Sequence, residues 1–507
     1  MQGHDILLGK SDGHLLSLPG GEHVALHART GAGKGVGFVI PNCFAWPGSL
    51  VVLDIKGEAY RATAGYRADV LRQDVYLLDP ASETGQSHRW DPFAAVQRAS
   101  LSRFRQIARQ ANLLFPEIDT VGGSGNNNKF WDDAGRQAFT AVATILAESP
   151  NQPLTMQAIT QIFTRDDGHD WLAAKVADSR KSGRPYSQIA IDGISDFIGS
   201  DPKLRGDIRK TVSTRLQTWS DPQIAAVTSA SDFELGDLRR KPMTIYVSVA
   251  PGNIPRLRPL LRLFWDQVIN ANTDATPEED PTLKVPAMFM LDEFARLGRM
   301  DALAQGAQYV RGYGIRMAFV IQNKAQVRAI YGKDGAADIF DNLGAEIVFG
   351  TADPELTKEL EERLGDNTVN VTTKNRPRFW SWLNWSKQSE AEHPHRRQLM
   401  LDQEVAQMAA DEQLIIRPGM RPMRTQRIRW WDDPEFSTLR RAAPSVEPLQ
   451  IKVATDDGST RVGATPSAPA KVPDNDRAKA SGRVRQPAGH AARPSAASRG
   501  RPQAPAA

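Results

Sequence analysis

Short apolar runs, rich in aliphatic and β-branched residues, recur along much of the chain and end in polar or turn residues. Helix-like stretches separate them. Strands that are apolar at every position and alternate with helices are typical of a parallel sheet covered on both faces. We therefore predict an α/β fold with a mainly parallel, doubly wound sheet. The predicted strands are residues 23–28, 50–55, 75–79, 244–249, 285–291, 315–321 and 346–349.

The strand pattern is absent between about residues 101 and 219, where helical periodicity takes its place. Ala138, Val142 and Leu146, for example, form one apolar stripe at helical spacing. This pattern indicates an all-helical domain inserted into the α/β core. We expect the first part of the core at residues 1–98, the insert at 99–219, the second part of the core at 220–436 and a tail at 437–507.

Charge is unevenly distributed along the chain. The 63 basic and 59 acidic residues give a net charge of +4. Residues 437–507 hold twelve basic and five acidic residues, a local charge of +7, which leaves −3 for residues 1–436. This tail has nine prolines and few large apolar side chains. Burial of its side chains therefore cannot offset the entropy that the segment would lose on folding. We predict a disordered basic tail that either solubilises the chain or binds DNA or anionic lipid.

The rest of the composition narrows the class of protein. A single cysteine, Cys43, excludes an internal disulfide and a cysteine-based zinc site. No apolar run reaches the roughly 18–20 residues that cross a bilayer, and the N-terminus has neither the basic nor the apolar part of a signal peptide. We expect a soluble, cytoplasmic chain without a transmembrane segment.

The first candidate for chemistry is the sequence ARTGAGKGVGFVIPN, which follows a predicted strand and opens a helix. A Gly-rich turn in this place directs successive N–H groups at an anion, so it can cradle phosphates while Lys34 reaches the β- and γ-phosphates of a nucleotide. The match to G-x-x-x-x-G-K-[ST] is imperfect, because Ala28 replaces the first glycine and Gly35 replaces the Ser/Thr whose hydroxyl would hold Mg²⁺. A plain strand-to-helix turn is the alternative. The candidate nucleotide-binding residues are Arg29, Thr30, Gly31, Ala32, Gly33, Lys34 and Gly35.

A complementary signal lies far downstream, in VPAMFMLDEFARLG, where an apolar strand ends in Asp292 and Glu293. Asp292 would hold Mg²⁺, directly or through water, and Glu293 would polarise the attacking water as general base. An Asp-Glu pair after a strand also occurs as a plain helix cap. Two partial signals in this order on one α/β sheet favour an ATPase site that uses ATP and Mg²⁺.

Three further positions each have two interpretations. Gln322 ends the strand IRMAFVIQN, where it either senses the γ-phosphate and orients water or is only a polar strand end. Arg311 either caps the preceding helix or projects as an arginine finger into the nucleotide site of a neighbouring subunit. Asp54 and Lys56, at the end of LVVLDIK, have either a turn role or a supporting role behind the nucleotide site.

These residues also carry a family resemblance. The segments ARTGAGKGVGFVIPNCFAWPGSLVVLDIKGEAYRATAGYR, LDEFARLGRMD and YGIRMAFVIQN resemble those of the TraG/VirD-type coupling ATPases of bacterial type IV secretion, and so does RRQLMLDQEVAQMAADEQLIIRPGMRPMRTQRIRWWDDPEF. The resemblance covers about residues 5–436. It implies a RecA-like P-loop NTPase domain interrupted by an all-helical domain and assembled as a homohexameric ring. Such a ring would feed single-stranded DNA, delivered with a relaxase, to a type IV secretion channel.

The resemblance also assigns roles to residues and a cellular place to the chain. Family members usually begin with two transmembrane helices, whereas this chain begins directly before the P-loop strand. We therefore expect a shortened chain, or one anchored by another polypeptide, at the cytoplasmic face of the bacterial inner membrane. Gly35 after Lys34 occurs in some members, so it puts direct Mg²⁺ ligation in doubt rather than nucleotide binding. The implied roles are Gly33 and Lys34 as the Walker A pair, Asp292 and Glu293 as the Walker B pair, Gln322 as sensor and Arg311 as finger in trans.

Two surfaces are candidates for contact with partners. One predicted helix of the insert carries basic residues beside its apolar stripe, which either form a solvated face or contact DNA or relaxase. Three tryptophans lie in the stretch 367–397, which we expect to be irregular; they serve as core, as a belt against membrane or channel, or as a stacking platform for single-stranded DNA. The residues are Arg205, Arg209, Lys210 and Arg215 in the helix, and Trp380, Trp382 and Trp385.

The main functional hypothesis is an ATP-driven coupling protein that recruits relaxase-bound DNA and pumps the DNA to the transfer channel. The alternative is a receptor ATPase that delivers protein effectors to such a channel, with nucleotide acting mainly as an assembly switch. Stimulation of ATP hydrolysis by DNA distinguishes the two. A third hypothesis, a paralogue that binds ATP without hydrolysing it, is motivated by Ala28 and Gly35.

Overall fold

The chain divides into two units, Met1–Ala464 and Thr465–Ala507. All described residues belong to the first unit, and most of the predicted basic tail therefore lies outside them. The computed structural model describes residues 4–116, 126–351, 353–374, 390–454 and 460–462.

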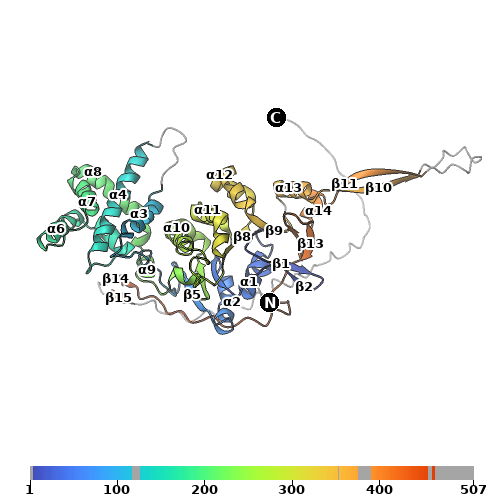
Figure 1. Cartoon of the computed structure of the whole chain (residues 1–507), viewed down its shortest axis with the longest axis horizontal. Coiled ribbons are helices and arrows are strands. Elements are labelled where there is room, and N and C mark those ends of the chain that lie inside the picture. The colour runs from blue at the N-terminus through green and yellow to red at the C-terminus, as the bar shows by residue number, and fades with distance from the viewer. Residues whose placement is uncertain (1–3, 117–125, 352, 375–389, 455–459, 463–507) are drawn as a thin grey trace, which may run out of the picture. The chain divides into compact units, whose positions relative to one another are not determined.

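One sheet of eleven strands organises the first unit (Figure 1). Its seven central strands run parallel to one another. They coincide with the seven strands predicted from the apolar runs, so the mainly parallel α/β sheet is confirmed. In spatial order they are β9 (Leu343–Phe349), β3 (His23–His27), β8 (Ile315–Ile321), β7 (Ala287–Leu291), β4 (Ser49–Asp54), β6 (Met243–Ser248) and β5 (Asp74–Leu78).

Four antiparallel strands extend the sheet beyond β9. None of them was predicted, because each is short or mixes polar with apolar positions. They join the N-terminal segment to a segment from the last quarter of the chain. From β9 outward they are β12 (Glu412–Ile416), β13 (Met423–Gln426), β1 (Ile6–Ser11) and β2 (His14–Leu18).

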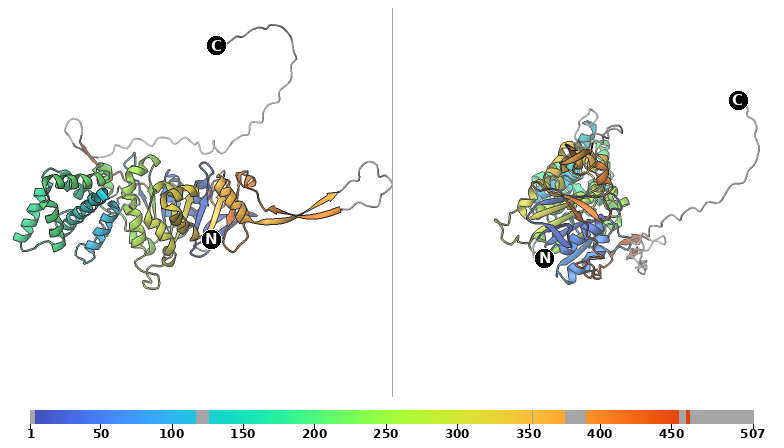
Figure 2. Two further views of the ribbon diagram at one scale, coloured as in Figure 1. Left: turned by 90° about the horizontal axis from the view of Figure 1, so that it is seen from above. Right: turned by 90° about the vertical axis from the view of Figure 1, so that its right-hand side faces the viewer.

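Alternate residues of most central strands enter two separate hydrophobic cores. In β4, Val51 and Leu53 pack into one core, whereas Leu50 and Val52 pack into the other. This is the period of two that a strand covered on both faces requires. Helices cover each face (Figures 1 and 2): α10 (Ile254–Ala271), α11 (Asp301–Tyr309) and α12 (Lys324–Asp341) lie on one, and α1 (Ile40–Ala45) and α2 (Glu58–Asp69) on the other.

Between β5 and β6 the described residues form helices and no strands. The longest of these helices buries Phe139, Val142 and Leu146, as its apolar stripe predicts. Asp201 and Asp221 cap two others and are each followed by proline at the first helical position. The helices are α3 (Arg103–Leu114), α4 (Asn126–Glu148), α5 (Met156–Thr164), α6 (Gly168–Lys181), α7 (Gln188–Gly199), α8 (Pro202–Arg215) and α9 (Pro222–Val227).

The region that we expected to be irregular, 367–397, contains a two-stranded antiparallel ribbon (Figure 2). That expectation was wrong, because polar strands paired only with each other lack the apolar pattern on which strand prediction depends. The three tryptophans fall at 380–385, outside the described residues. The ribbon and its flanking helices are α13 (Pro354–Leu364), β10 (Asp366–Lys374), β11 (Glu390–Gln398) and α14 (Asp402–Ala406).

The packed part of the chain continues beyond residue 436, where we expected the tail to begin. Val446 and Leu449 are buried, and the N–H of Leu449 donates to the carbonyl of Gly85 over 2.9 Å. The hydroxyl of Tyr60 donates to the carbonyl of Pro444 over 3.1 Å. Residues 437–451 therefore form a strap across the body; two short strands, β14 (Lys452–Ala454) and β15 (Thr460–Val462), follow it.

The remaining elements are short helical turns between strands and helices. In the part of the chain that the structure describes, no helix combines the length and the apolar character needed to cross a bilayer. The turns are η1 (Gly35–Val39), η2 (Gln217–Ser220), η3 (Leu235–Arg239), η4 (Pro251–Asn253), η5 (Phe294–Leu297) and η6 (Val310–Tyr313).

Candidate functional site

The candidate phosphate loop lies at the carboxyl edge of the parallel sheet, between β3 and η1. Gly31 and Gly33 have φ angles of 79° and 81°, which only glycine adopts without strain. The N–H of Ala28 donates to the carbonyl of Ile321 over 3.0 Å and so fixes the start of the loop to β8. Helix begins directly after Lys34. The loop therefore has the strand-turn-helix form that points N–H groups at an anion.

Five predicted residues, two of them from the loop itself, meet at this place. The Lys34 ammonium donates to Glu293 Oε1 over 2.7 Å and lies 3.5 Å from Asp292 Oδ1. Gln322 Nε2 donates to the same Glu293 oxygen over 3.0 Å. The hydroxyl of Thr30 donates to Gln322 Oε1 over 3.0 Å. One chain of hydrogen bonds thus joins the phosphate loop, the end of β7 and the end of β8.

Glu293 has an unusual backbone and a strongly electrostatic environment. Its φ of 54° lies in the left-handed region, which is uncommon for a residue other than glycine and costs about 1–3 kcal/mol. Burial by itself would raise the pKa of Glu293, but the hydrogen bond and charge of Lys34, with the charges of Arg296 and Lys56, lower it below its ordinary value. Glu293 is therefore ionised at neutral pH and is held by Lys34 on one oxygen and by Arg296 on the other.

Asp292 has the features of a metal ligand. Its Oδ1 is buried and accepts no hydrogen bond from the described residues. Burial raises the pKa of Asp292, because it outweighs the attraction of Lys34. No cluster of three or more His, Cys, Asp or Glu side chains that could hold a metal occurs among the described residues. A Mg²⁺ ion that brings phosphate oxygens with it fits this place, since one protein carboxylate then suffices.

Asp54 is the last residue of β4, which neighbours β7 in the sheet, and Lys56 follows two positions later. Asp54 Oδ2 accepts the N–H of Tyr60 over 2.8 Å, so the carboxylate fixes the first turn of α2. Burial raises the pKa of Asp54 to about 6, although the N–H groups that it accepts oppose this. Of the two roles that we weighed for Asp54, the structure places it in the turn. The exposed Lys56 acts on Asp292 and Glu293 through its charge.

Arg311 does not join the other predicted residues. It is exposed in η6, which precedes the amino end of β8, whereas Gln322 follows the carboxyl end. Seven strand residues at about 3.3 Å each separate the two ends by about 20 Å. Arg311 therefore cannot reach the Lys34 site of its own chain, and its role as a finger stays a prediction about a neighbouring subunit.

Arg427, just beyond β13, hydrogen-bonds to the backbone of the phosphate loop. This contact was not predicted. Its guanidinium donates to the carbonyl of Ala32 over 3.0 Å and lies over the ring of Phe349, 4.2 Å from the centroid. Burial lowers the pKa of Arg427 to about 10. A contact between residues 395 positions apart has no local signal in the sequence.

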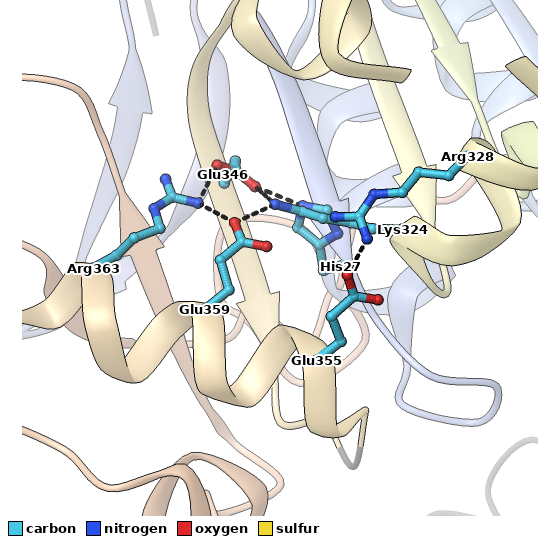
Figure 3. Close-up of polar contacts among 7 residues, drawn as sticks. All are labelled: His27, Lys324, Arg328, Glu346, Glu355, Glu359 and Arg363. Carbon is cyan, nitrogen blue, oxygen red and sulfur yellow. Dashed lines mark hydrogen bonds and ion pairs between the residues drawn. The ribbon is translucent and has the colours of Figure 1, made fainter. Parts of the chain in front are cut away.

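A buried ion-pair cluster joins the strand that precedes the phosphate loop to its neighbours (Figure 3). This cluster was not predicted. Glu346 on β9 accepts from Lys324 at the start of α12 over 3.1 Å and from Arg363 on α13 over 2.7 Å. Its other close contact is His27 Nε2, at 2.9 Å. Glu359 pairs with the same two cations. Because His27 directly precedes the phosphate loop and Lys324 follows Gln322 by two positions, this cluster ties both ends of the site to α13.

Comparison with known proteins decides the family of this chain. The family model for type IV secretory system conjugative DNA transfer matches residues 3–454. The chain belongs to this family.

Individual relatives agree with this assignment. Protein VirD4 of Agrobacterium fabrum (strain C58 / ATCC 33970) is 27% identical over 452 residues, which cover 89% of this chain and 65% of VirD4. The conjugal transfer protein TraG of Escherichia coli is 26% identical over 381 residues, which cover 72% of this chain and 58% of TraG. The matches thus span less than two thirds of the length of these curated relatives. The resemblance to the TraG/VirD family that the motifs predict is thus confirmed.

A solved structure extends the comparison to the fold. The plasmid coupling protein TrwB in complex with ADP and Mg²⁺ has a TM-score of 0.57 to this chain, with 18% identity over 85% of this chain and 90% of that one. The likeness confirms the predicted fold class, an α/β fold with a mainly parallel sheet and a helical insert.

In this member of the family, the arginines that we considered for DNA contact are engaged within the insert. Arg205 donates to the carbonyl of Ile198 and Arg209 to that of Phe163, each over 2.7 Å, so both satisfy the ends of neighbouring helices. Arg215 pairs with Asp132 at 2.8 Å. Lys210 is exposed. These contacts favour a structural role for the three arginines over the alternative of binding phosphates.

Proposed function

We propose that the chain is an ATP-hydrolysing coupling protein that moves DNA to a type IV secretion channel. The observation that carries this proposal is the meeting of Lys34, Glu293 and Gln322 at one edge of the sheet, beside a Gly-rich loop. A positive group, an ionised carboxylate and an amide placed together suit binding of a phosphate chain and attack by water on it. The likeness to TrwB, whose structure was determined with ADP and Mg²⁺, supports the same assignment.

The geometry suggests how the site responds to ATP. The loop N–H groups and Lys34 would bind the phosphates, and Asp292 would hold Mg²⁺, which neutralises charge on the phosphates. A γ-phosphate would compete with Glu293 for the Lys34 ammonium, which now donates to Glu293 over 2.7 Å. As Lys34 shifts toward the phosphate, Glu293 would become a better acceptor for a proton of the attacking water, while Arg296 and Gln322 would hold its carboxylate in place.

The proposal includes a homohexameric ring. Arg311 lies exposed at the sheet edge opposite to the Lys34 site, and a head-to-tail ring places one edge of a subunit against the other edge of its neighbour. Arg311 would act there as an arginine finger in trans. The ring would stand at the cytoplasmic face of the inner membrane, beside its secretion channel, and would receive single-stranded DNA with a relaxase.

The test is ATP hydrolysis by the purified chain, with and without single-stranded DNA. We expect DNA to stimulate hydrolysis and the stimulation to fall steeply with salt. Lys34→Thr should lower the rate by about 100-fold or more, because it removes the cation that stabilises the transferred phosphoryl group. Lys284→Thr, a change at an exposed lysine before β7, serves as the matched control.

Each contrary result points to one of the other hypotheses. Full activity in Lys34→Thr would contradict the assignment of the site. Hydrolysis that is indifferent to DNA would favour the effector receptor, in which nucleotide acts as an assembly switch. ATP binding without release of phosphate would favour a non-hydrolysing paralogue.

A further inference from the structure

Position 35 poses a chemical problem, because glycine there leaves Mg²⁺ without the hydroxyl that a Ser or Thr would supply. The space beside Gly35 is occupied by an acidic group. Glu58 Oε2 lies 3.4 Å from the place where a Cβ on Gly35 would be, and it is the one described atom within 4 Å of that place outside the local chain. A Ser hydroxyl would be bonded to that Cβ, so a small rotation of the exposed Glu58 side chain brings this oxygen to the place that the hydroxyl would take.

Backbone contacts hold Glu58 in this position. Gly57, with φ of 65°, turns the chain sharply between β4 and α2, and its N–H donates to the carbonyl of Asp54 over 3.2 Å. The Asp54 carboxylate accepts the N–H of Tyr60 and so fixes the first turn of α2. Glu58 is the first residue of that turn, and its side chain is exposed.

Glu58 has no competing partner, since it makes no hydrogen bond or ion pair with any described residue. Asp292, the candidate metal ligand, follows β7, and β7 pairs in parallel with β4. The residues after the two strands therefore share one edge of the sheet. Lys56 brings a positive charge to this edge and acts on Asp292, which offsets part of the added negative charge.

We propose that Glu58 supplies an oxygen to the Mg²⁺ of the bound nucleotide, in place of the hydroxyl that Gly35 lacks. This inference rests on the proposed nucleotide site. It predicts a property that a neutral hydroxyl would not give. An extra carboxylate repels the phosphates when no cation is present and attracts the cation when it is, so nucleotide binding should depend unusually strongly on the metal.

The experiment measures binding rather than hydrolysis, on the full chain. Mn²⁺ is titrated by electron paramagnetic resonance in the presence of a non-hydrolysable ATP analogue, and a fluorescent ATP analogue is titrated in Mg²⁺ and in EDTA. We expect Glu58→Gln to weaken Mn²⁺ binding by about tenfold or more and to leave binding in EDTA equal or tighter. Gly35→Ser in the Glu58→Gln background should restore most of the loss, since it supplies the hydroxyl.

Two control variants separate this role from a simple acid at a helix N-terminus. Glu58→Asp keeps the charge at the start of α2 but withdraws the oxygen by one methylene, so it should also lose Mn²⁺ affinity. Asp69→Asn removes one charge from the other end of the same helix and should change nothing. Thermal unfolding of each variant checks that it is folded.

The outcomes separate the two proposals. If the wild-type chain binds nucleotide in a Mg²⁺-dependent way and Glu58→Gln binds Mn²⁺ equally well, the inference about Glu58 is wrong and the nucleotide site stands. Loss of Mn²⁺ affinity in Glu58→Gln but not in Glu58→Asp would assign Glu58 to helix stability and also overturn the inference. If the wild-type chain binds no nucleotide with or without metal, both proposals fail.

Discussion

Glu293 combines three features that are costly at an ordinary position: it is buried, it is ionised, and its backbone is left-handed. Lys34 and Arg296 compensate the charge. Strain at a buried carboxylate persists only where surrounding contacts enforce it. Here the fixed backbone aims one carboxylate oxygen at both Lys34 and Gln322, so a phosphate that draws Lys34 away changes the charge balance of Glu293 directly.

This arrangement predicts that a substitution at Glu293 impairs ATP hydrolysis but not ATP binding. Glu293→Gln keeps the size of the side chain and an oxygen that accepts from Lys34, but it removes the proposed general base. We expect ATP hydrolysis to fall by about 100- to 10,000-fold, while the affinity for a non-hydrolysable ATP analogue stays within a few-fold of the wild type. Single-turnover hydrolysis and equilibrium binding measure the two. Equal losses in both would show that Glu293 serves binding and is not the base.

At the residue scale, sequence reasoning brought together the residues that follow apolar strands. Lys34, Asp292, Glu293 and Gln322 were predictable because carboxyl ends of parallel strands meet at one edge of the sheet. Arg427 was not predictable, because it follows β13, a four-residue inner strand without a clear apolar pattern. Its contact with Ala32 depends on how the antiparallel strands close against β9.

At the element scale, the ion-pair cluster of Figure 3 joins β3, β9, α12 and α13. Glu346 and Glu359 face Lys324 and Arg363, so two carboxylates balance two cations in a largely buried place. Burial alone would raise the pKa of Glu346, but the hydrogen bond from His27 and the charges of His27, Lys324 and Arg363 hold it well below its ordinary 4.5. A buried cluster of this kind is sensitive to the loss of any one member.

The cluster predicts that replacing a buried carboxylate costs much more folding stability than replacing an exposed carboxylate nearby. Glu346→Gln leaves Lys324 without its most buried partner, and we expect the free energy of unfolding to fall by about 3–5 kcal/mol. Glu355→Gln, which breaks the exposed pair with Arg328, should change it by less than about 1 kcal/mol. Denaturant unfolding at neutral pH compares the two. Similar losses of unfolding free energy in both variants would show that burial does not make the Glu346 ion pairs more important than the exposed pair.

The same cluster gives a pH dependence with a definite sign. Because the folded-state pKa of Glu346 is depressed, its contribution to stability is present above the unfolded-state pKa of 4.5 and is lost as pH falls toward the folded value. Wild-type stability should therefore fall more steeply below about pH 4.5 than that of Glu346→Gln. If the stability of the two proteins fell equally steeply in acid, the pKa of Glu346 in the folded state would not be depressed.

Element prediction succeeded where burial on both faces leaves a continuous apolar run, as in the seven parallel strands. It failed for β13, whose four residues MRTQ have no apolar periodicity, and for the ribbon of β10 and β11, whose strands pair only with each other. The predicted boundary at residue 436 also placed the end of the packed body too early. Val446 and Leu449 are isolated apolar residues in a Pro-rich stretch, and they are buried because the body provides sites for them.

At the scale of the whole molecule, two features of the chain concern assembly. The strap of residues 437–451 contacts α2 through Tyr60 and the β5 side of the sheet through Gly85, so the end of the packed chain braces its beginning. Arg311 lies at the amino edge of the sheet and cannot reach its own nucleotide site. If Arg311 acts as the arginine finger that we propose, a complete site at Lys34 needs a second copy of the chain.

The last prediction tests this proposed role of Arg311. In a head-to-tail ring, each interface combines Lys34 of one subunit with Arg311 of the next. Arg311→Ala and Lys34→Thr should each abolish DNA-stimulated hydrolysis alone. Mixed in equal amounts, they should recover activity, because about one interface in four pairs an intact Lys34 with an intact Arg311.

A mixture of Arg311→Ala with the double variant Lys34→Thr/Arg311→Ala is the matched control, since no interface in it can hold both residues. Hydrolysis measured across mixing ratios should peak near equal amounts in the first mixture and stay flat in the second. No recovery at any ratio, with mixed rings demonstrated by co-purification of differently tagged subunits, would show that Arg311 does not act in trans.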